Sequence, residues 1–265
     1  MQAGDLRMHV LLHPFQNGLD VQLRVRPFGV DVGPYFAPGE GDRRVIGVVN
    51  EQICNALRDL PAEAKALDAL QMESPLLSAA LAQSGAVPDP EAALDLLAEL
   101  QLASSAPILA WPKGKAKRVL IAQKFNISST SGRDWLGIEA ELDISEGSIK
   151  LSELIGLLEN SRGRYLMLDS ERVVQISESL RKRVQAIARF ADARGKVELP
   201  LLAGSVLTDS LGLNELVGAE HKKLSAMNAK MARAFTLSPE LPSTLQAELR
   251  DYQISGYRWL MQMAH

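Results

Sequence analysis

The spacing of apolar side chains predicts β-structure at the start of the chain. Apolar residues alternate with polar ones in two runs: Met8, Val10 and Leu12, then Val21, Leu23 and Val25. Such a period of two is typical of strands with one buried face. Asn17-Gly18 lies between the runs and favours a hairpin, since both residue types tolerate positive φ. After a loop rich in Pro and Gly, residues 45–49 are expected to form another strand. We predict a β-rich segment over residues 1–54.

A helical period replaces this alternation further along the chain. Apolar side chains recur at spacings of three and four: Leu57, Leu60, Ala64, Leu67 and Leu70. This spacing places them on one face of an amphipathic helix. A second, short helix is expected over residues 76–81. A third begins at Pro88-Asp89-Pro90, because proline is favoured in the first helical turn. Residues 55–112 are therefore predicted to be a helical segment, with a strand at 108–111.

The clearest strand pattern lies between residues 136 and 144. One face is apolar and the other is acidic, with Glu139, Glu141 and Asp143 beside Gly137. We expect a half-buried strand with a solvated acidic face, and we expect Trp135, at its start, to be largely buried. Strands at 119–122 and 165–168, a short helix at 151–158 and a helix capped by Ser177 complete a predicted α+β domain over residues 113–218.

The last part of the chain is expected to be helical. Leu224, Met227, Met231 and Phe235 follow a helical spacing. Prolines at 239 and 242 interrupt it, and a final helix is predicted from Leu245 toward the terminus. We predict helices over residues 219–265, and the fold class of the whole chain is α+β.

Composition and charge exclude several classes of protein. The 265 residues carry 29 Lys and Arg against 32 Asp and Glu, a net charge of -3, so a globally basic nucleic-acid binder is not indicated. Cys54 is the single cysteine, which excludes an internal disulfide and a cysteine-based zinc site. No apolar run approaches the roughly 20 residues of a membrane helix. We expect a cytoplasmic protein without a membrane partner.

Motifs for catalysis are not found. Gly114-Lys115 does not match a phosphate-binding loop, because Leu109 stands at the position of its first glycine and Ala116 at that of its Ser or Thr. His9 and His13 are placed to share a strand face, but no third metal ligand is evident. The sequence therefore predicts no catalytic residue, metal or cofactor for the chain itself.

Two local concentrations of positive charge are candidates for contact with DNA. The first is a loop with Lys113, Lys115, Lys117 and Arg118, and the second is the helix with Arg181, Lys182, Arg183 and Arg189. Contacts of this kind go to phosphates, so binding is expected to be weak and independent of base sequence. Ordinary solvated charge remains the alternative for each surface.

The most specific motif lies near the C-terminus. Residues 241–260 read LPSTLQAELRDYQISGYRWL. This segment resembles the one that leads into the ATPase core of bacterial SNF2-like helicases, where L-R-x-Y-Q-x-x-G-x-x-W-L precedes the Walker A strand. Upstream, Arg133-Asp134-Trp135-Leu136 and the strand containing Glu139 to Leu142 resemble the helicase-associated region of the same family. Residues 24–29 and 38–41 also fit proteins of this kind.

The resemblance implies roles for three residues. Gln253 matches the family glutamine whose amide reads the adenine edge by donating and accepting at once, and Tyr252 and Arg250 flank the nucleotide or stabilise the motif. Packing of a terminal helix is the alternative role for all three. The chain stops at His265, before the phosphate loop, the Mg-binding motif and the arginine fingers.

The implied function is that of a non-catalytic accessory region of an ATP-dependent translocase of double-stranded DNA. By resemblance, residues 113–218 are its helicase-associated domain, and residues 219–265 are a connector with the first helix of an ATPase lobe. ATP and Mg would belong to the full-length parent, and the partners would be DNA, another protein or the ATPase lobes of the same polypeptide. A free-standing protein-interaction module with no nucleotide role is the main alternative, and an independent enzyme is a third.

Overall fold

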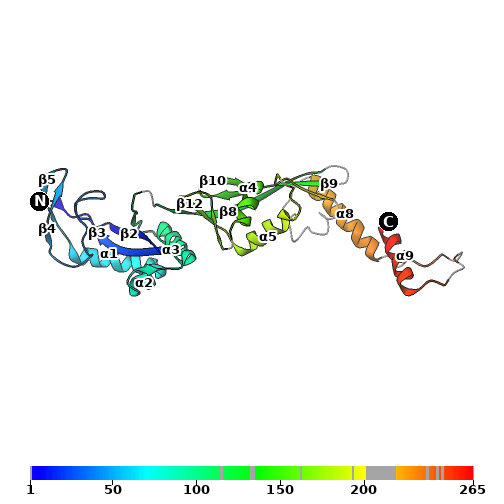
Figure 1. Cartoon of the computed structure of the whole chain (residues 1–265), viewed down its shortest axis with the longest axis horizontal. Helices are drawn as coiled ribbons and strands as arrows, with labels where there is room; N and C mark the ends of the chain where they lie inside the picture. Colours follow the sequence, from blue (N-terminus) through cyan, green and yellow to red (C-terminus); the bar gives the residue numbers. More distant parts are fainter. Residues whose placement is uncertain are drawn as a thin grey trace. The chain divides into compact units, whose positions relative to one another are not determined.

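The computed structural model confirms the α+β class (Figure 1). It describes residues 2–113, 116–131, 135–161, 163–192, 194–200, 219–236, 239–242, 245 and 248–264. The chain forms two compact units. Unit 1 contains residues 1–122 and 161–176, and unit 2 contains residues 123–160 and 177–265. The division into four segments at residues 54, 112 and 218 stays a prediction.

A long hairpin forms the centre of unit 1. Strands β2 (Met8–Phe15) and β3 (Gly18–Val25) pair antiparallel, as predicted, and β6 (Ala86–Val87) and β7 (Ile108–Ala110) flank them in the order β6-β3-β2-β7. The turn lies one residue earlier than expected, because Phe15 pairs with Gly18. Gly18 is needed for a different reason: a Cβ there would collide with the Val87 carbonyl.

Three helices cover this sheet: α1 (Leu60–Glu73), α2 (Pro75–Ala82) and α3 (Pro90–Leu102). Each begins with an N-cap side chain that accepts a backbone N–H from the first helical turn. The caps are Asp59, Ser74 and Asp89 respectively. The first helix begins three residues later than its pattern suggested, because Leu57 ends a strand. The buried core joins both layers and includes Val10, Leu12, Val21, Leu23, Leu70, Leu77, Leu96 and Leu97.

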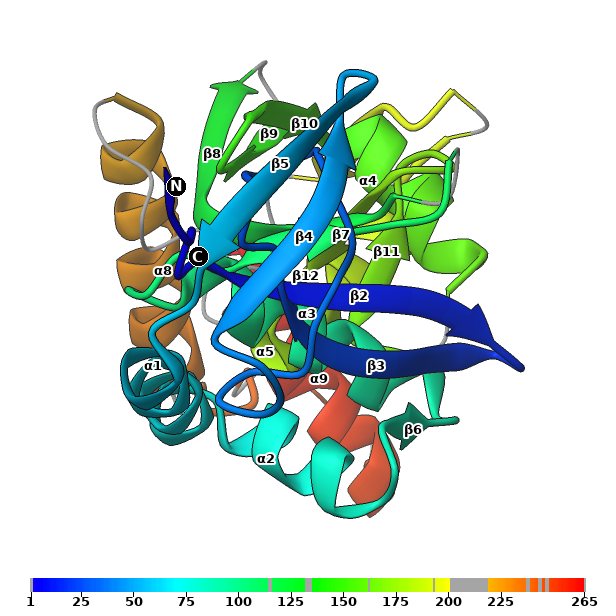
Figure 2. The ribbon, with the colours of Figure 1, turned by 90° about the vertical axis from the view of Figure 1, so that its left-hand side faces the viewer.

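A second, smaller sheet in unit 1 was only partly predicted. Its strands follow the order β1 (Gln2–Ala3), β5 (Gln52–Leu57) and β4 (Arg44–Val49). The predicted strand at 45–49 is confirmed as β4, whereas β5 was not expected. Asn50 and Glu51 connect the two with φ of 48° and 64°, the positive values of a type I′ hairpin turn. Figure 2 shows this hairpin in front of β2 and β3.

Unit 1 is completed by strands from later in the chain. β11 (Tyr165–Met167) pairs with β12 (Arg172–Gln175), which runs parallel to the first residues of β8 (Arg118–Ser131). β11 was predicted and β12 was not. The Tyr165 hydroxyl donates to Asp95 at 2.5 Å, and the Arg164 guanidinium donates to the same carboxylate at 2.7 Å. These bonds attach the β11 segment to α3.

Unit 2 is built on the strand with the clearest alternation. β9 (Trp135–Ile144) pairs with β10 (Gly147–Lys150) and, nearer its start, with β13 (Val197–Pro200). Helices α4 (Leu151–Glu159) and α5 (Glu178–Ala188) supply the other side of the core. Ser177 caps α5 as predicted, accepting the Leu180 N–H at 3.1 Å. Buried residues of this core include Leu136, Ile138, Leu142, Leu154, Leu158, Val184 and Ile187.

The expected burial of Trp135 is wrong. Its side chain is 43% exposed, whereas Leu136 is fully buried. The alternation itself explains this result, since Trp135 has the same parity as Gly137, Glu139 and Glu141 and shares their face. The indole lies beside Gly137, where a Cβ would come within 3.1 Å of the ring. Glu139 and Glu141 are exposed as predicted.

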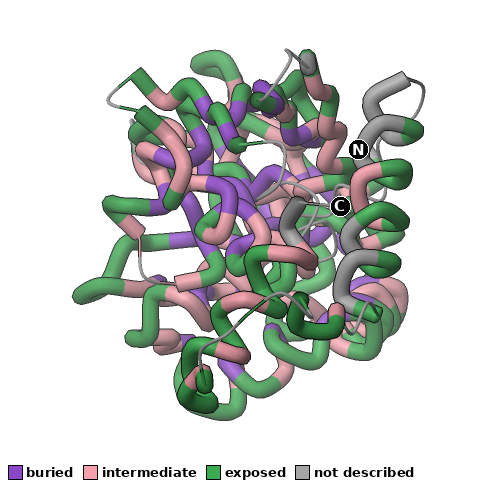
Figure 3. The backbone as a smooth tube through the Cα atoms, turned by 90° about the vertical axis from the view of Figure 1, so that its right-hand side faces the viewer, coloured by how far each residue is buried: buried purple, intermediate pink, exposed green. Residues whose placement is uncertain are grey.

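Two helices follow in the C-terminal part of unit 2. α8 (Ala219–Thr236) is confirmed where the helical spacing was seen, and α9 (Asp251–Ala264) begins six residues later than the predicted start at Leu245. Most side chains described on α8 and α9 are exposed (Figure 3). Among the described residues, no helix combines the length and apolar character needed to cross a membrane.

Candidate functional site

The three residues singled out by the C-terminal motif lie at the start of α9. Arg250 precedes the first helical residue, and its carbonyl accepts the Ile254 N–H at 3.0 Å. The Gln253 amide oxygen in turn accepts the Arg250 N–H at 2.9 Å. A side chain three residues into a helix that bonds back to the N-cap is one half of a capping box. Gln253 therefore fixes the start of α9, which explains why the helix does not begin at Leu245.

The motif residues also define an exposed stripe on α9. Tyr252, Gly256, Trp259 and Leu260 follow the spacing i, i+4, i+7 and i+8, so they share one face of the helix. Tyr252 is 67% exposed, Trp259 55% and Leu260 62%. We call these four residues the α9 stripe. The half-buried residues Ile254, Tyr257 and Met261 lie on a different face, and the Tyr257 hydroxyl donates to the Glu240 carbonyl at 3.3 Å.

The basic loop predicted from sequence is only partly described. Lys115, like Arg133 and Asp134 of the upstream motif, lies outside the described residues. Lys113 is exposed, and the Lys117 ammonium lies 3.5 Å from the Ser170 carbonyl. Arg118 is also exposed, and its backbone N–H bonds to the Glu171 carbonyl at 2.7 Å as β8 begins.

The basic helix presents fewer cations to solvent than its sequence suggested. The sequence predicted that Arg181 lies on the polar face of the helix, but Arg181 is only 7% exposed and is therefore buried. Its position three residues before the buried Val184 puts it at the margin of the apolar stripe. Lys182 pairs with Glu178 at 3.6 Å, and the Arg183 guanidinium stacks over Phe125 at 5.3 Å from the ring centroid. Arg189 is exposed at the end of the helix.

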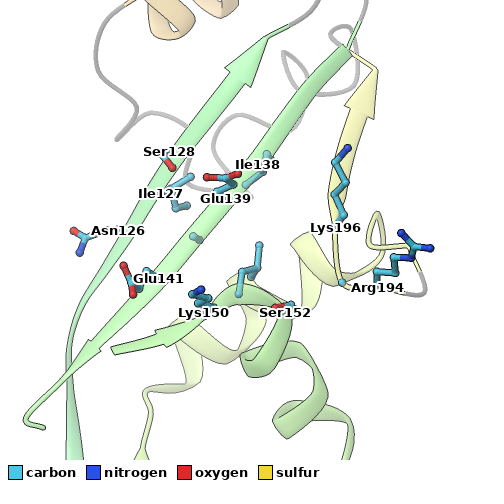
Figure 4. Close-up of a pocket in the computed structure, with 13 residues that line it drawn as sticks. Asn126, Ile127, Ser128, Ile138, Glu139, Glu141, Lys150, Ser152, Arg194 and Lys196 are labelled. Carbon is cyan, nitrogen blue, oxygen red and sulfur yellow. The ribbon is translucent and has the colours of Figure 1, made fainter. Parts of the chain in front are cut away.

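Unit 2 also contains a groove that sequence reasoning missed. It arises because β10 leaves β9 at the Lys150–Glu141 pair and β13 joins only at the Val197–Ile138 pair. Among the described residues, no strand pairs with Glu139 and Ala140 on that edge. The gap has a volume of about 520 Å³ (Figure 4). Its lining comes from β8, β9, the start of α4 and the turn before β13: residues 126–128, 138–141, 150–152 and 194–196.

Charges of both signs line this groove. Lys150 and Glu141 lie near one another at its base, whereas Arg194 points away from β8 and β9 (Figure 4). Lys196 is paired with Glu198 at 2.5 Å. α4 starts without a side-chain cap on its first backbone N–H groups. Since the carboxylates of Glu139 and Glu141 oppose the cations, the groove does not select a nucleic-acid phosphate by charge.

The lysines and arginine of the groove are far apart in sequence, which is why no pattern signalled them. Lys150 ends a hairpin, while Arg194 and Lys196 belong to a turn more than forty residues later. Gly195 brings that turn against α4: it has φ of 75°, and a Cβ there would lie 2.6 Å from the Ser152 Cβ. Only the register of β9 with β10 and β13 shows that these segments meet.

Clusters of metal ligands are not found in the described part of the chain. No group of three or more His, Cys, Asp and Glu side chains there is placed to hold a metal ion. His9 and His13 both lie on β2, but His9 is buried and His13 exposed.

Comparisons with protein-family models, with curated proteins and with solved structures give no match to this chain. The functional interpretation therefore depends on the residues themselves.

Proposed function

We propose that this chain is a non-catalytic accessory region of an SNF2-like ATP-dependent DNA translocase, acting in the cytoplasm. Its main task is to position the ATPase lobe through α9. Residues 1–200 supply the folded body, and α9 supplies the first helix of the lobe. Contact with DNA is a secondary role carried by exposed cations.

The observation that carries this proposal is the α9 stripe. Aromatic and apolar side chains at helical spacing normally pack into a core. In α9 they are instead exposed, and they are the same residues that match the helicase motif. An exposed Tyr, Trp and Leu on one helical face supports docking against a further domain, since leaving them in water forgoes the burial energy of about 1.5–3 kcal/mol per large apolar side chain.

The capping bond of Gln253 is compatible with a nucleotide role. Its amide oxygen accepts the Arg250 N–H, but a carbonyl-type oxygen has two lone pairs and the amide group also has two N–H donors. Gln253 therefore keeps one acceptor position and its donors for an adenine edge. By itself the residue offers nothing for the triphosphate charge, so tight binding of ATP requires a phosphate loop from elsewhere.

DNA contact by this chain alone is proposed to be weak. Exposed positive charge among the described candidates comes from Lys113, Lys182 and Arg189. Arg181 is buried and does not contribute to this surface. A few phosphate contacts give binding that depends steeply on salt and little on base sequence.

The reading frame of the natural gene gives the most economical test. The proposal expects it to continue past residue 265 into a glycine-rich loop ending in Lys and Ser or Thr. A frame without that loop overturns the proposal. In a polypeptide with the loop, replacing Trp259 by Ala is expected to lower DNA-stimulated ATP hydrolysis at least about tenfold, the effect of losing a central interface anchor. Met72→Ala is the matched control, because Met72 is 84% exposed in unit 1.

A free-standing interaction module is the second candidate. The observation in its favour is a separate exposed apolar surface on the hairpin of β4 and β5, where Ile46, Val48 and Ile53 are each more than 60% exposed. The reading frame distinguishes the two functions, since a module of this kind needs no ATPase sequence after it.

A further inference from the structure

The hairpin of β4 and β5 has an apolar face that no described residue covers. Directly opposite residues of an antiparallel pair share a face, and the register pairs Val48 with Ile53 and Ile46 with Asn55. Ile46 is 65% exposed, Val48 64% and Ile53 77%. We call Ile46, Val48 and Ile53 the β4–β5 patch. Single exposed apolar residues are common, but three adjacent ones on one sheet face indicate an interaction surface.

The opposite face of the same hairpin is already occupied. Val45 and Ala56 are buried there. Gly47 packs so tightly that a Cβ would come within 2.8 Å of the Phe28 ring and 3.1 Å of Pro34. The hairpin is therefore held in one orientation, and the patch cannot turn inward by a register change, since a shift of one residue would drive bulkier side chains against Phe28.

The hairpin also has a free backbone edge. In a two-residue hairpin the closing pair, here Val49 and Gln52, exchanges hydrogen bonds, and every second pair does so after it. The bond from the Arg58 N–H to the Arg43 carbonyl, at 2.7 Å, continues this series. The N–H and C=O groups of Ile46 and Val48 consequently point away from β5. β4 is the terminal strand of its sheet, and no described strand pairs with that edge.

Charged residues of opposite sign lie at the two ends of the β4–β5 hairpin. Arg44 lies opposite Leu57 on the face of the patch, at the base of the hairpin, and it is exposed with no ion pair among the described residues. Glu51 is exposed at the tip. A strand added antiparallel to β4 would run from the tip toward Arg44. Its residues would meet Val48 first, then Ile46, and then Arg44.

We propose that β4 accepts an extended segment of a partner protein as an added strand, and that the segment has the pattern apolar-x-apolar-x-acidic. The two apolar side chains cover the β4–β5 patch, and the carboxylate pairs with Arg44. Main-chain hydrogen bonds to Ile46 and Val48 supply affinity, and the alternate side chains supply specificity. This site lies in unit 1, and it does not depend on the role proposed for α9.

The test uses a fluorescein-labelled ten-residue peptide that begins with threonine, alternates threonine with valine and has aspartate in place of the last valine. It is titrated with the 265-residue chain and followed by anisotropy. Saturable binding is expected. Ile53→Lys and Ile46→Lys should each weaken it at least about tenfold, as for a central interface residue. Met72→Lys is the matched control, since it also adds a charge at an exposed apolar position of unit 1, and it should change nothing.

Two peptide controls examine the edge and the charge separately. A peptide N-methylated at alternate residues cannot form one row of main-chain hydrogen bonds, and a peptide with lysine in place of aspartate reverses the charge that faces Arg44. Both should bind at least about tenfold more weakly. Equal binding of the N-methylated peptide overturns strand addition. No binding of the parent peptide, or equal binding to Ile53→Lys, overturns the site.

Two further occupants are distinguished by direct measurements on the same proteins. Sedimentation that shows a dimer of the wild type and a monomer of Ile53→Lys would assign the patch to a second copy. Co-sedimentation with vesicles of phosphatidylcholine and phosphatidylserine, lost in Ile53→Lys, would assign it to a lipid surface. Either result overturns the proposal.

Discussion

Arg58 and Glu63 form a buried ion pair that ties the glycine- and proline-rich loop of unit 1 to the start of α1. Their side chains are each 1% exposed, and the Arg58 guanidinium donates to the Glu63 carboxylate at 2.5 Å and 3.0 Å. Arg58 also donates to the carbonyls of Ala37 and Glu40, and Glu63 accepts the Gly39 N–H. Three loop backbone groups are thus satisfied by two side chains.

Removal of either partner is expected to destabilise unit 1 strongly. Arg58→Ala and Glu63→Ala should each lower the free energy of unfolding by about 3–5 kcal/mol, because the remaining charge stays buried without compensation. Denaturant unfolding measures this change. Arg7→Ala serves as control, since Arg7 pairs with Asp5 at the surface with its side chain 57% exposed, and its loss should be much smaller than that of either buried partner. Losses of similar size in all three variants would contradict the account.

His9 is a buried titratable group next to the same loop. Its residue is 1% exposed, and neither ring nitrogen has a hydrogen-bond partner among the described residues. The ring packs edge-on against Tyr35 at 5.5 Å, and Arg26 stacks over Tyr35 at 4.7 Å. Burial first, and then the positive charge of Arg26, lower the pKa of His9 below 6.5, with Asp5 and Asp31 opposing the shift and Arg7 adding to it.

Stability should consequently depend on pH through His9. The unfolded chain binds a proton near pH 6.5 and the folded chain only at lower pH, so this group's contribution is complete above about pH 6.5 and is lost as the pH falls below it. Denaturant unfolding at pH 7.5 and pH 5.5 should show a loss in the wild type that is smaller in His9→Phe. His13→Gln, at the exposed histidine of β2, should behave as wild type. An unchanged pH dependence in His9→Phe would exclude this mechanism.

Trp135 and Leu136 offer a test of how β9 is oriented. Leu136→Ala should cost about 2–5 kcal/mol because the residue is fully buried. Trp135→Ala should cost well under the roughly 3–5 kcal/mol of a buried tryptophan, since its side chain is 43% exposed. Thermal unfolding of the two variants side by side measures the order. A larger loss for Trp135→Ala would reverse the assigned faces.

DNA binding, if carried by α5, should involve its exposed cations and not Arg181. Two phosphate contacts, from Lys182 and Arg189, would give a log–log salt slope of about -1.8. Lys182→Glu with Arg189→Glu should remove this dependence, and the same reversal at Lys113 and Lys117 tests the loop. Anisotropy with two duplexes of unrelated sequence should give equal affinities. Wild-type binding by both double variants would exclude both surfaces.

Sequence reasoning located the elements whose signal is local. Alternation in β2, β3 and β9 predicted strands, and the prolines at 88 and 90 and the cap Ser177 marked helix starts, because these patterns depend only on neighbouring residues. The alternation of β9 was also sufficient to predict that Trp135 is exposed, because Trp135 falls on the same face of the strand as Glu139 and Glu141. The prediction of burial was wrong because it gave the general tendency of tryptophan to be buried more weight than the strand pattern.

The elements that were missed depend on distant partners. β12 and β13 have four residues each, too few for a clear period, and they are strands because β8 and β9 pair with them. β5 was not recognised because its last residue, Leu57, fits the helical spacing of the next segment and was assigned to that helix. The groove beside Glu139 and Ala140 follows from two strand registers, and the exposure of the α9 stripe follows from packing, so neither has a signature in sequence.

The central claim is that this chain serves an ATPase lobe joined to α9. The most direct measurement is DNA-stimulated ATP hydrolysis, compared between residues 1–265 and the full-length product of the natural gene. The account predicts no hydrolysis by residues 1–265, because their sequence has no phosphate-binding loop, and DNA-stimulated turnover by the full-length product. Turnover by residues 1–265 alone, or none by the full-length product, would contradict it.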